Sequence, residues 1–237
     1  MDRVEVEERP RVTPAMLRRA DDLCRRRLAR EHAGGKQHAN RTADARFAVA
    51  NRLVADARLA HVDAETVRRE AFVEPHELAP EQRALYRAGV RGYLAEFGAR
   101  PGRAADLGWR TTLETLDVDL MGDAGLALER PDGSHEIRIL KLGGRRSGAP
   151  LLDPVELRCV LARTDEWAPN DLVIVATDLI EQESVTHVPD LARERAGAAE
   201  WLAERVALIA AYAADGRPRA GADCNGCAFV AGCSAHA

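Results

Sequence analysis

Three cysteines near the end of the sequence have the spacing of metal or cluster ligands. They are Cys224, Cys227 and Cys233, in the pattern C-x2-C-x5-C, and another cysteine, Cys24, lies far upstream. Thiolates at this spacing are seldom a packing feature, because they bind zinc and iron–sulfur clusters. A site with ligands from both ends of a chain would hold the fold closed. These residues therefore bear on the fold as well as on the chemistry.

Basic residues supply the second chemical signal. Lys36 and Lys141 are the only lysines among 34 basic residues, and a lysine kept against such a bias indicates a position where a guanidinium would not serve. Residues 11–60 contain 12 Arg and Lys and 5 Asp and Glu, a local charge of +7. Since the net charge of the chain is −4, the other residues together carry −11. This basic segment favours phosphate contacts or a solvated helix face equally.

Bulk composition predicts a soluble globular protein. The chain has 237 residues, of which 46% are hydrophobic and 30% charged, enough to bury a sizeable core. The acidic start lacks an apolar signal segment, and the longest apolar stretch, Val206–Ala214, is too short to span a bilayer. We therefore expect a cytoplasmic protein with no membrane partner. In that reducing compartment five cysteines indicate ligands and a spare thiol, not disulfides.

The first hundred residues are predicted to be mainly helical. Thr13 and Pro14 are a typical N-cap and first-turn pair, and they open a helix with Cys24 on its apolar side. A second helix is expected at about 40–60, and Pro80 opens a third. The apolar stripe of this third helix is Tyr86, Val90, Tyr93 and Phe97.

A sheet is predicted to follow the helical region. The expected strands are 109–116, 120–129, 135–142, 172–175 and 184–188, with a turn at 131–134, a helix from Asp153-Pro154 and a long helix at about 190–214. The pattern predicts an α/β (α+β) fold with a central mixed sheet. We expect one domain over 1–237, with 1–100 mainly helical, 101–190 the sheet core, and 190–237 the long helix and cysteine cluster.

Five of these features occur in the order seen in a nuclease family. They are a helix with Cys24, the segment Gly35–His38, a hairpin ending in Ile139, Leu140 and Lys141, a helix over 153–163, and the C-terminal cysteines. This arrangement resembles the iron–sulfur branch of the RecB-type PD-(D/E)XK nucleases, over about residues 12–233. That branch includes the CRISPR-adaptation exonucleases and the nuclease module of AddB helicase–nucleases. The resemblance implies a restriction-endonuclease-like core.

The resemblance also implies a cofactor. In that family one upstream and three C-terminal cysteines hold a [4Fe–4S] cluster, which carries over to Cys24, Cys224, Cys227 and Cys233. Thiolates also suit zinc, so the spacing leaves both metals open. The fifth cysteine, Cys159, lies on the helix predicted over 153–163 and is interpreted as a core thiol.

The catalytic motifs of the family are incomplete in this sequence. Gly125 stands where the motif G-x-x-D has its acid, and Ile139 stands where (D/E)-x-K has its acid, although Lys141 is present. The family's Q-x-x-x-Y signature reads Glu156 to Val160, whereas His38 matches its histidine ligand. Mg²⁺ or Mn²⁺ needs anionic oxygen ligands to activate water. The resemblance therefore implies a nuclease fold with impaired catalysis.

A re-sited acid would restore the metal site. Alternation along the strand expected at 120–129 places Asp123 on the face of Gly125, about 6.6 Å away along the strand. Metal–oxygen bonds are only about 2.0–2.6 Å, so Asp123 replaces the acid only if a bulge at Gly125 re-aims the strand. On the neighbouring strand, alternation leaves Glu136 facing away from Ile139 and Lys141.

Three functions follow, in order of preference. The first is a [4Fe–4S] protein of nuclease fold that binds DNA, acts beside a helicase or another DNA-processing subunit, and cleaves poorly. Its phosphate contacts would come from the basic segment 11–60 and from Lys36, His38, Lys141, Arg145 and Arg146. The second is an active Mg²⁺- or Mn²⁺-dependent DNA exonuclease that uses Asp123. The third is an iron–sulfur protein that acts on a small molecule.

Overall fold

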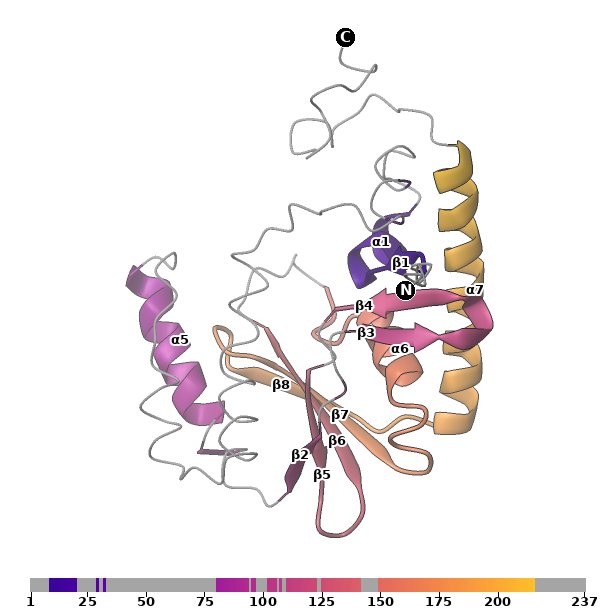
Figure 1. Cartoon of the computed structure of the whole chain (residues 1–237). Helices are drawn as coiled ribbons and strands as arrows, with labels where there is room; N and C mark the ends of the chain where they lie inside the picture. The colour runs from indigo at the N-terminus through magenta and orange to yellow at the C-terminus, as the bar shows by residue number, and fades with distance from the viewer. Residues whose placement is uncertain are drawn as a thin grey trace, which may run out of the picture. The chain divides into compact units, whose positions relative to one another are not determined.

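The chain divides into two compact units, drawn in Figure 1 and described separately below. The computed structural model describes residues 9–20, 29, 32, 80–93, 95–96, 102–105, 107, 110–122, 125–141 and 149–215. Unit 1 takes its residues from 1–38, 109–122 and 195–237, and unit 2 from 39–108 and 123–194. The single domain over 1–237 stays a prediction. Within the described ranges no helix is long and apolar enough to cross a membrane.

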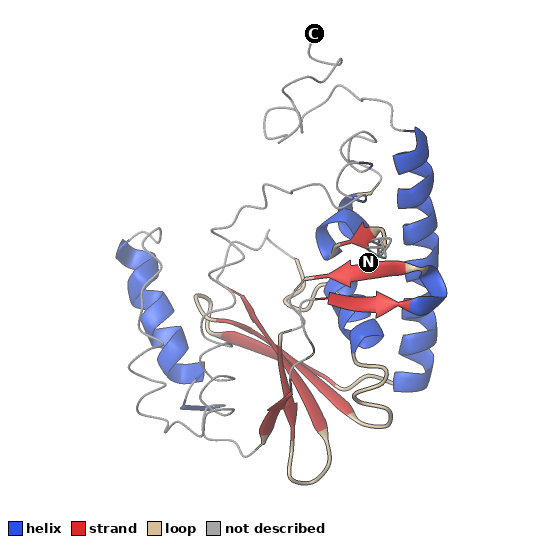
Figure 2. Ribbon diagram, viewed as in Figure 1, coloured by secondary structure: helices blue, strands red, loops and turns tan. Residues whose placement is uncertain are grey.

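Unit 2 contains a five-stranded mixed sheet. Its strands, in spatial order, are β2 (Arg103–Ala105), β5 (Leu126–Glu129), β6 (His135–Lys141), β7 (Leu172–Asp178) and β8 (Glu183–His187). The pair β6 and β7 is parallel, and the other neighbours are antiparallel. Strand β6 lies at the centre of the sheet (Figure 2). The mixed α/β character predicted from the sequence is confirmed at this level.

A tight turn joins β5 and β6 into the predicted hairpin. Gly133 takes a φ of 83°, which favours glycine, and its N–H donates to the carbonyl of Arg130. Asp132 accepts hydrogen bonds from the hydroxyl and the N–H of Ser134 at 2.7 and 2.9 Å. These bonds lower the pKa of the Asp132 carboxyl. The turn expected at 131–134 is confirmed.

Helix α6 (Pro154–Arg163) connects the two parallel strands, as a parallel pair requires a crossover. Asp153 caps the helix, since its Oδ1 accepts the N–H groups of Val155 and Glu156 at 2.8 and 3.2 Å. Cys159 lies buried on this helix, which confirms its interpretation as a core residue.

Helix α5 (Pro80–Tyr93) packs on the core of unit 2. The stripe predicted from its periodicity is confirmed for Tyr86, Val90 and Tyr93, all of which are buried. They belong to one hydrophobic cluster with side chains of the sheet and the segment after β7. Its other members are Ala104, Leu126, Leu128, Leu140, Val175, Leu179 and Ile180.

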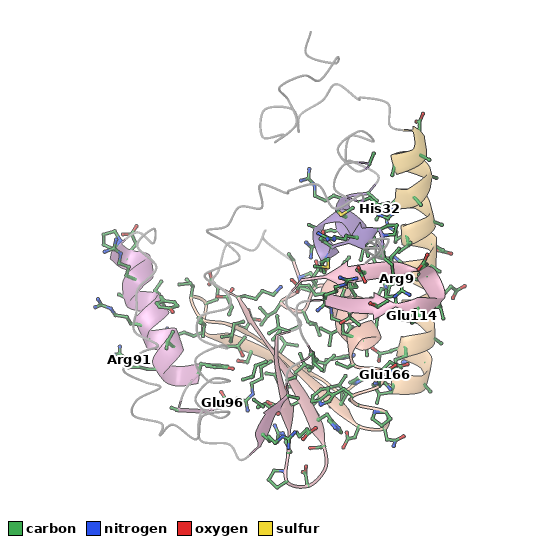
Figure 3. All side chains as sticks on the ribbon, viewed as in Figure 1. Arg9, His32, Arg91, Glu96, Glu114 and Glu166 are labelled. Atoms are coloured by element: carbon green, nitrogen blue, oxygen red, sulfur yellow. The ribbon has the colours of Figure 1, made fainter. Side chains whose placement is uncertain are left out.

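Unit 1 contains a three-stranded sheet of order β1-β4-β3. The strands are β1 (Arg11–Val12), β3 (Arg110–Leu113) and β4 (Val118–Met121), with β1 parallel and β3 antiparallel to β4. A 3₁₀ turn (Glu114–Leu116) and a left-handed Asp117 link β3 to β4. Arg9 binds Glu114 in this link (Figure 3). It also forms an ion pair with Asp117.

Two helices complete the described part of unit 1. Helix α1 (Pro14–Arg19) begins at the predicted cap, where the Thr13 hydroxyl accepts the N–H of Met16 at 3.2 Å. Most of α7 (Leu191–Asp215) belongs to this unit and confirms the long helix expected at about 190–214. The helix predicted at 40–60 and Phe97 lie outside the described residues.

The continuous strand predicted over 120–129 is wrong. Gly122 and Gly125 have φ angles of 128° and 86°, which a regular strand does not contain. The residues on either side of this break belong to β4 in one sheet and β5 in another. Because the strand is not regular here, alternation does not place Asp123 on the face of Gly125. The strand predicted at 109–116 is also too long, because it ends at Leu113.

Candidate functional site

Lys141 is the predicted catalytic residue that the structure describes, and it pairs with Glu156. Its Nζ donates to Oε2 of Glu156 across the connection from β6 to α6. The side chains are 17% and 27% exposed, so the pair is neither buried nor fully solvated. Lys141 ends β6, and Glu156 lies in the first turn of α6. The ion pair therefore links the end of the central strand to the start of the helix.

A second carboxylate lies beside this pair. Asp178 is directly opposite Lys141 in the parallel register of β6 and β7, and opposite residues share a face of the sheet. The Asp178 side chain is buried, and its Oδ1 accepts the N–H groups of Ile180 and Glu181 at 2.9 and 3.1 Å. Lys141 and Asp178 therefore start from neighbouring positions on one face of the sheet.

Gly125, which stands where the family has its first acid, has no room for a side chain. Its φ of 86° strains any residue with a Cβ, and a Cβ there would lie 2.5 Å from the carbonyl oxygen of Arg138. Ile139, in place of the second acid, is half-buried and lies opposite Ala176 of β7. At these two positions the backbone and side chains are those of a packed sheet.

The opposite face of β6 carries a buried polar network. Glu136 and Arg138 alternate with Lys141 along the strand, and the guanidinium of Arg138 donates to the carboxylate of Glu136. Arg130 also contacts Glu136. Burial lowers the pKa of Arg138, while Tyr93 and Glu96 act in the opposite direction. The prediction that Glu136 faces away from Lys141 is confirmed.

In unit 1, two segments from opposite ends of the chain are in direct contact. Arg205 of α7 donates from Nε and Nη2 to the carbonyl oxygen of Leu17 in α1, at 3.0 and 2.9 Å. The contact spans 188 residues of sequence. The same guanidinium lies 6.0 Å from the ring centre of Trp201, within cation–π range. The two hydrogen bonds from Arg205 hold α1 against α7.

The other predicted site residues lie outside the described part of the chain. They are the ligands Cys24, Cys224, Cys227 and Cys233, together with Lys36, His38, Asp123, Arg145 and Arg146. Among the residues that are described, no group of three or more His, Cys, Asp and Glu side chains could hold a metal ion.

The Lys141–Glu156 ion pair is the feature of the site that sequence reasoning missed. Asp153-x-x-Glu156 is the sequence of a helix N-terminus and places Glu156 in the first turn. It does not reveal the partner, since the contact depends on how the crossover from β6 returns to the sheet.

No protein-family model matches the chain, and no curated protein matches its sequence.

Proposed function

We propose that this chain is an iron–sulfur protein of RecB-like nuclease fold that binds nucleic acid and has impaired cleavage. The observation that carries the proposal is the position of Lys141. It ends the second strand of a hairpin, and helix α6 follows it and leads to the parallel strand β7. This order of elements agrees with the family that the sequence motifs resemble.

The proposal of impaired cleavage rests on the two acid positions. An aspartate at position 125 would combine a strained φ with a Cβ 2.5 Å from a backbone oxygen. Position 139 carries a hydrocarbon side chain, which cannot ligate a divalent cation. Lys141, the remaining member of the motif, is paired with Glu156. These features favour a role in binding over hydrolysis.

The cluster assignment rests on the cysteine set and on the contact between α1 and α7. Four thiolates suit a [4Fe–4S] cluster, and also zinc. Cys24 follows Ala20 by 4 residues and Cys224 follows Asp215 by 9. These connections reach at most about 14 and 32 Å. Because Arg205 fixes α1 against α7, both segments start from one part of unit 1. They are long enough to meet in a shared site.

One anaerobic preparation tests the whole proposal. Iron, sulfide and zinc are quantified first, and about four iron atoms per chain are expected. The same sample is then tested for binding of single- and double-stranded DNA over a range of salt concentrations, and for Mn²⁺-dependent cleavage. Binding should weaken steeply with salt. Zinc without iron overturns the cluster, absence of binding at low salt overturns the nucleic-acid role, and cleavage overturns the impairment.

The break between β4 and β5 favours a second candidate, an active exonuclease that uses Asp123. A regular strand would hold Asp123 too far from the position of Gly125, but the positive φ angles of Gly122 and Gly125 show that the strand is not regular there. Mn²⁺-dependent cleavage that is lost in both Asp123→Asn and Lys141→Ala would establish this candidate. Cleavage that survives Asp123→Asn would exclude the aspartate as the re-sited acid.

A further inference from the structure

The charges around Lys141 do not favour an incoming anion. Lys141 pairs with Glu156, and Asp178 lies opposite Lys141 in the register at the same end of the parallel strands β6 and β7. The Asp178 carboxylate is buried and holds two backbone N–H groups of the following turn, so it is fixed in place. The Glu156 side chain is 27% exposed, so solvent and dissolved anions reach this ion pair.

We propose that Glu156 is a counter-charge that occupies Lys141 until a phosphate group of nucleic acid displaces it. This inference rests on the proposed nucleic-acid binding and names one of its contacts. Phosphate and carboxylate oxygens bind an ammonium in the same way, so the two anions compete for one cation. Glu156 therefore lowers the affinity for nucleic acid by the free energy of its ion pair with Lys141.

The start of α6 does not offer a second phosphate contact at this point. A helix N-terminus attracts anions through its free N–H groups. Here the Asp153 side chain accepts the N–H groups of both Val155 and Glu156. The anion is therefore expected at the ammonium of Lys141.

Glu156→Gln tests the counter-charge with little change of shape, and Glu166→Gln is its matched control. Glu166 follows α6, is exposed, and loses the same charge when amidated (Figure 3). Binding of labelled single- and double-stranded oligonucleotides is measured by anisotropy. Glu156→Gln should bind about threefold to fivefold more tightly than wild type, as expected for a partly exposed ion pair. Glu166→Gln should change affinity by less than about twofold.

A double-mutant cycle with Lys141→Gln tests whether the gain in DNA affinity of Glu156→Gln depends on Lys141. Lys141→Gln should weaken binding less in the wild type than in Glu156→Gln, because Glu156 occupies the ammonium in the wild type. The salt dependence gives an independent measure. In the Glu156→Gln background, Lys141→Gln should flatten the slope of log K against log salt by about 0.9 for duplex and about 0.7 for single-stranded DNA, the value for one lost phosphate contact.

The possible outcomes separate this inference from the proposed function. If neither wild type nor Glu156→Gln binds DNA at low salt, both proposals are overturned. If the wild type binds DNA and Glu156→Gln has the same affinity as Glu166→Gln, the counter-charge role of Glu156 is overturned and the proposed function stands. Cleavage that disappears in Glu156→Gln without a gain in affinity assigns Glu156 to metal binding and overturns the counter-charge. If Glu156→Gln gains affinity for inorganic phosphate but not for DNA, each compared with Glu166→Gln, the ligand is free phosphate and the nucleic-acid assignment of Lys141 is overturned.

Discussion

Gly89 and Gly92 lie one turn apart on α5 and should respond in opposite ways to alanine. A Cβ on Gly89 would lie 1.7 Å from the carbonyl oxygen of Leu179, and real contacts of this kind are not shorter than 3.0 Å. The helix would therefore have to withdraw by at least 1.3 Å, the difference between these distances. A Cβ on Gly92 has no heavy atom within 4 Å.

The structure sets the size of the expected effect. Withdrawing α5 loosens the packing of Tyr86, Val90 and Tyr93, and overpacking of a core costs about 1–3 kcal/mol. A clash with the backbone should cost an amount near the upper end of this range. The higher helix propensity of alanine offsets about 1 kcal/mol of that cost. Gly89→Ala should therefore lose about 2 kcal/mol of unfolding free energy. Gly92→Ala should gain up to about 1 kcal/mol.

Urea unfolding followed by far-ultraviolet circular dichroism measures the difference directly. The two variants should differ by about 3 kcal/mol at equal m-values, which corresponds to about 6–12 °C in Tm for a chain of this size. The two substitutions have the same composition and lie on the same helix, so changes in the unfolded state largely cancel. If Gly89→Ala were as stable as Gly92→Ala, the close approach of α5 to Leu179 would be refuted.

Three further substitutions test other parts of the structure. Arg205→Ala should cost about 1.5–3 kcal/mol in urea unfolding, because a charged donor to the Leu17 carbonyl is lost; if the proposed cluster is present, iron should also be lost faster to a chelator. The hydroxyl of Tyr86 has no hydrogen-bond partner among the described residues, and burial raises its pKa. Tyr86→Phe should therefore be neutral or stabilising by up to about 1 kcal/mol, and it should reduce the loss of stability above pH of about 10, where tyrosine ionises first in the unfolded chain. Unchanged alkaline unfolding would contradict this. Gly125→Asp should destabilise by more than about 2 kcal/mol and fail to restore Mn²⁺-dependent cleavage, whereas a stable, active variant would show that this backbone accepts the acid.

Local signals in the sequence predicted the elements that they control. Thr13, Pro80 and Asp153 marked helix starts, and each helix begins there or at the next residue. The turn at 131–134 was equally local, since glycine and aspartate determine its geometry within four residues. Such features depend on neighbours in the chain, so one sequence contains the information needed to predict them.

Features that depend on distant residues were not predictable in this way. The two-residue strand β1 forms only because β4 lies beside it, more than a hundred residues later. The alternation of hydrophobic residues predicted one strand through Gly122 and Gly125. This prediction failed because a hydrophobic pattern contains no information about a positive φ angle. The Lys141–Glu156 pair and the Arg205–Leu17 contact likewise follow from the path of the chain in space.

The order in which the chain is synthesised has a consequence for unit 1. Its strands and α1 are complete once residue 122 has been made, but Arg205 follows only after the entire sheet of unit 2. At about 5–20 residues per second, this interval lasts on the order of 4–17 s. During it, Leu17, which is buried in the finished unit, lacks its contact with Arg205 of α7. A chain stalled between the end of β8 at His187 and Arg205 would present an unfinished unit 1 to chaperones and proteases, although the sheet of unit 2 already has all its strands.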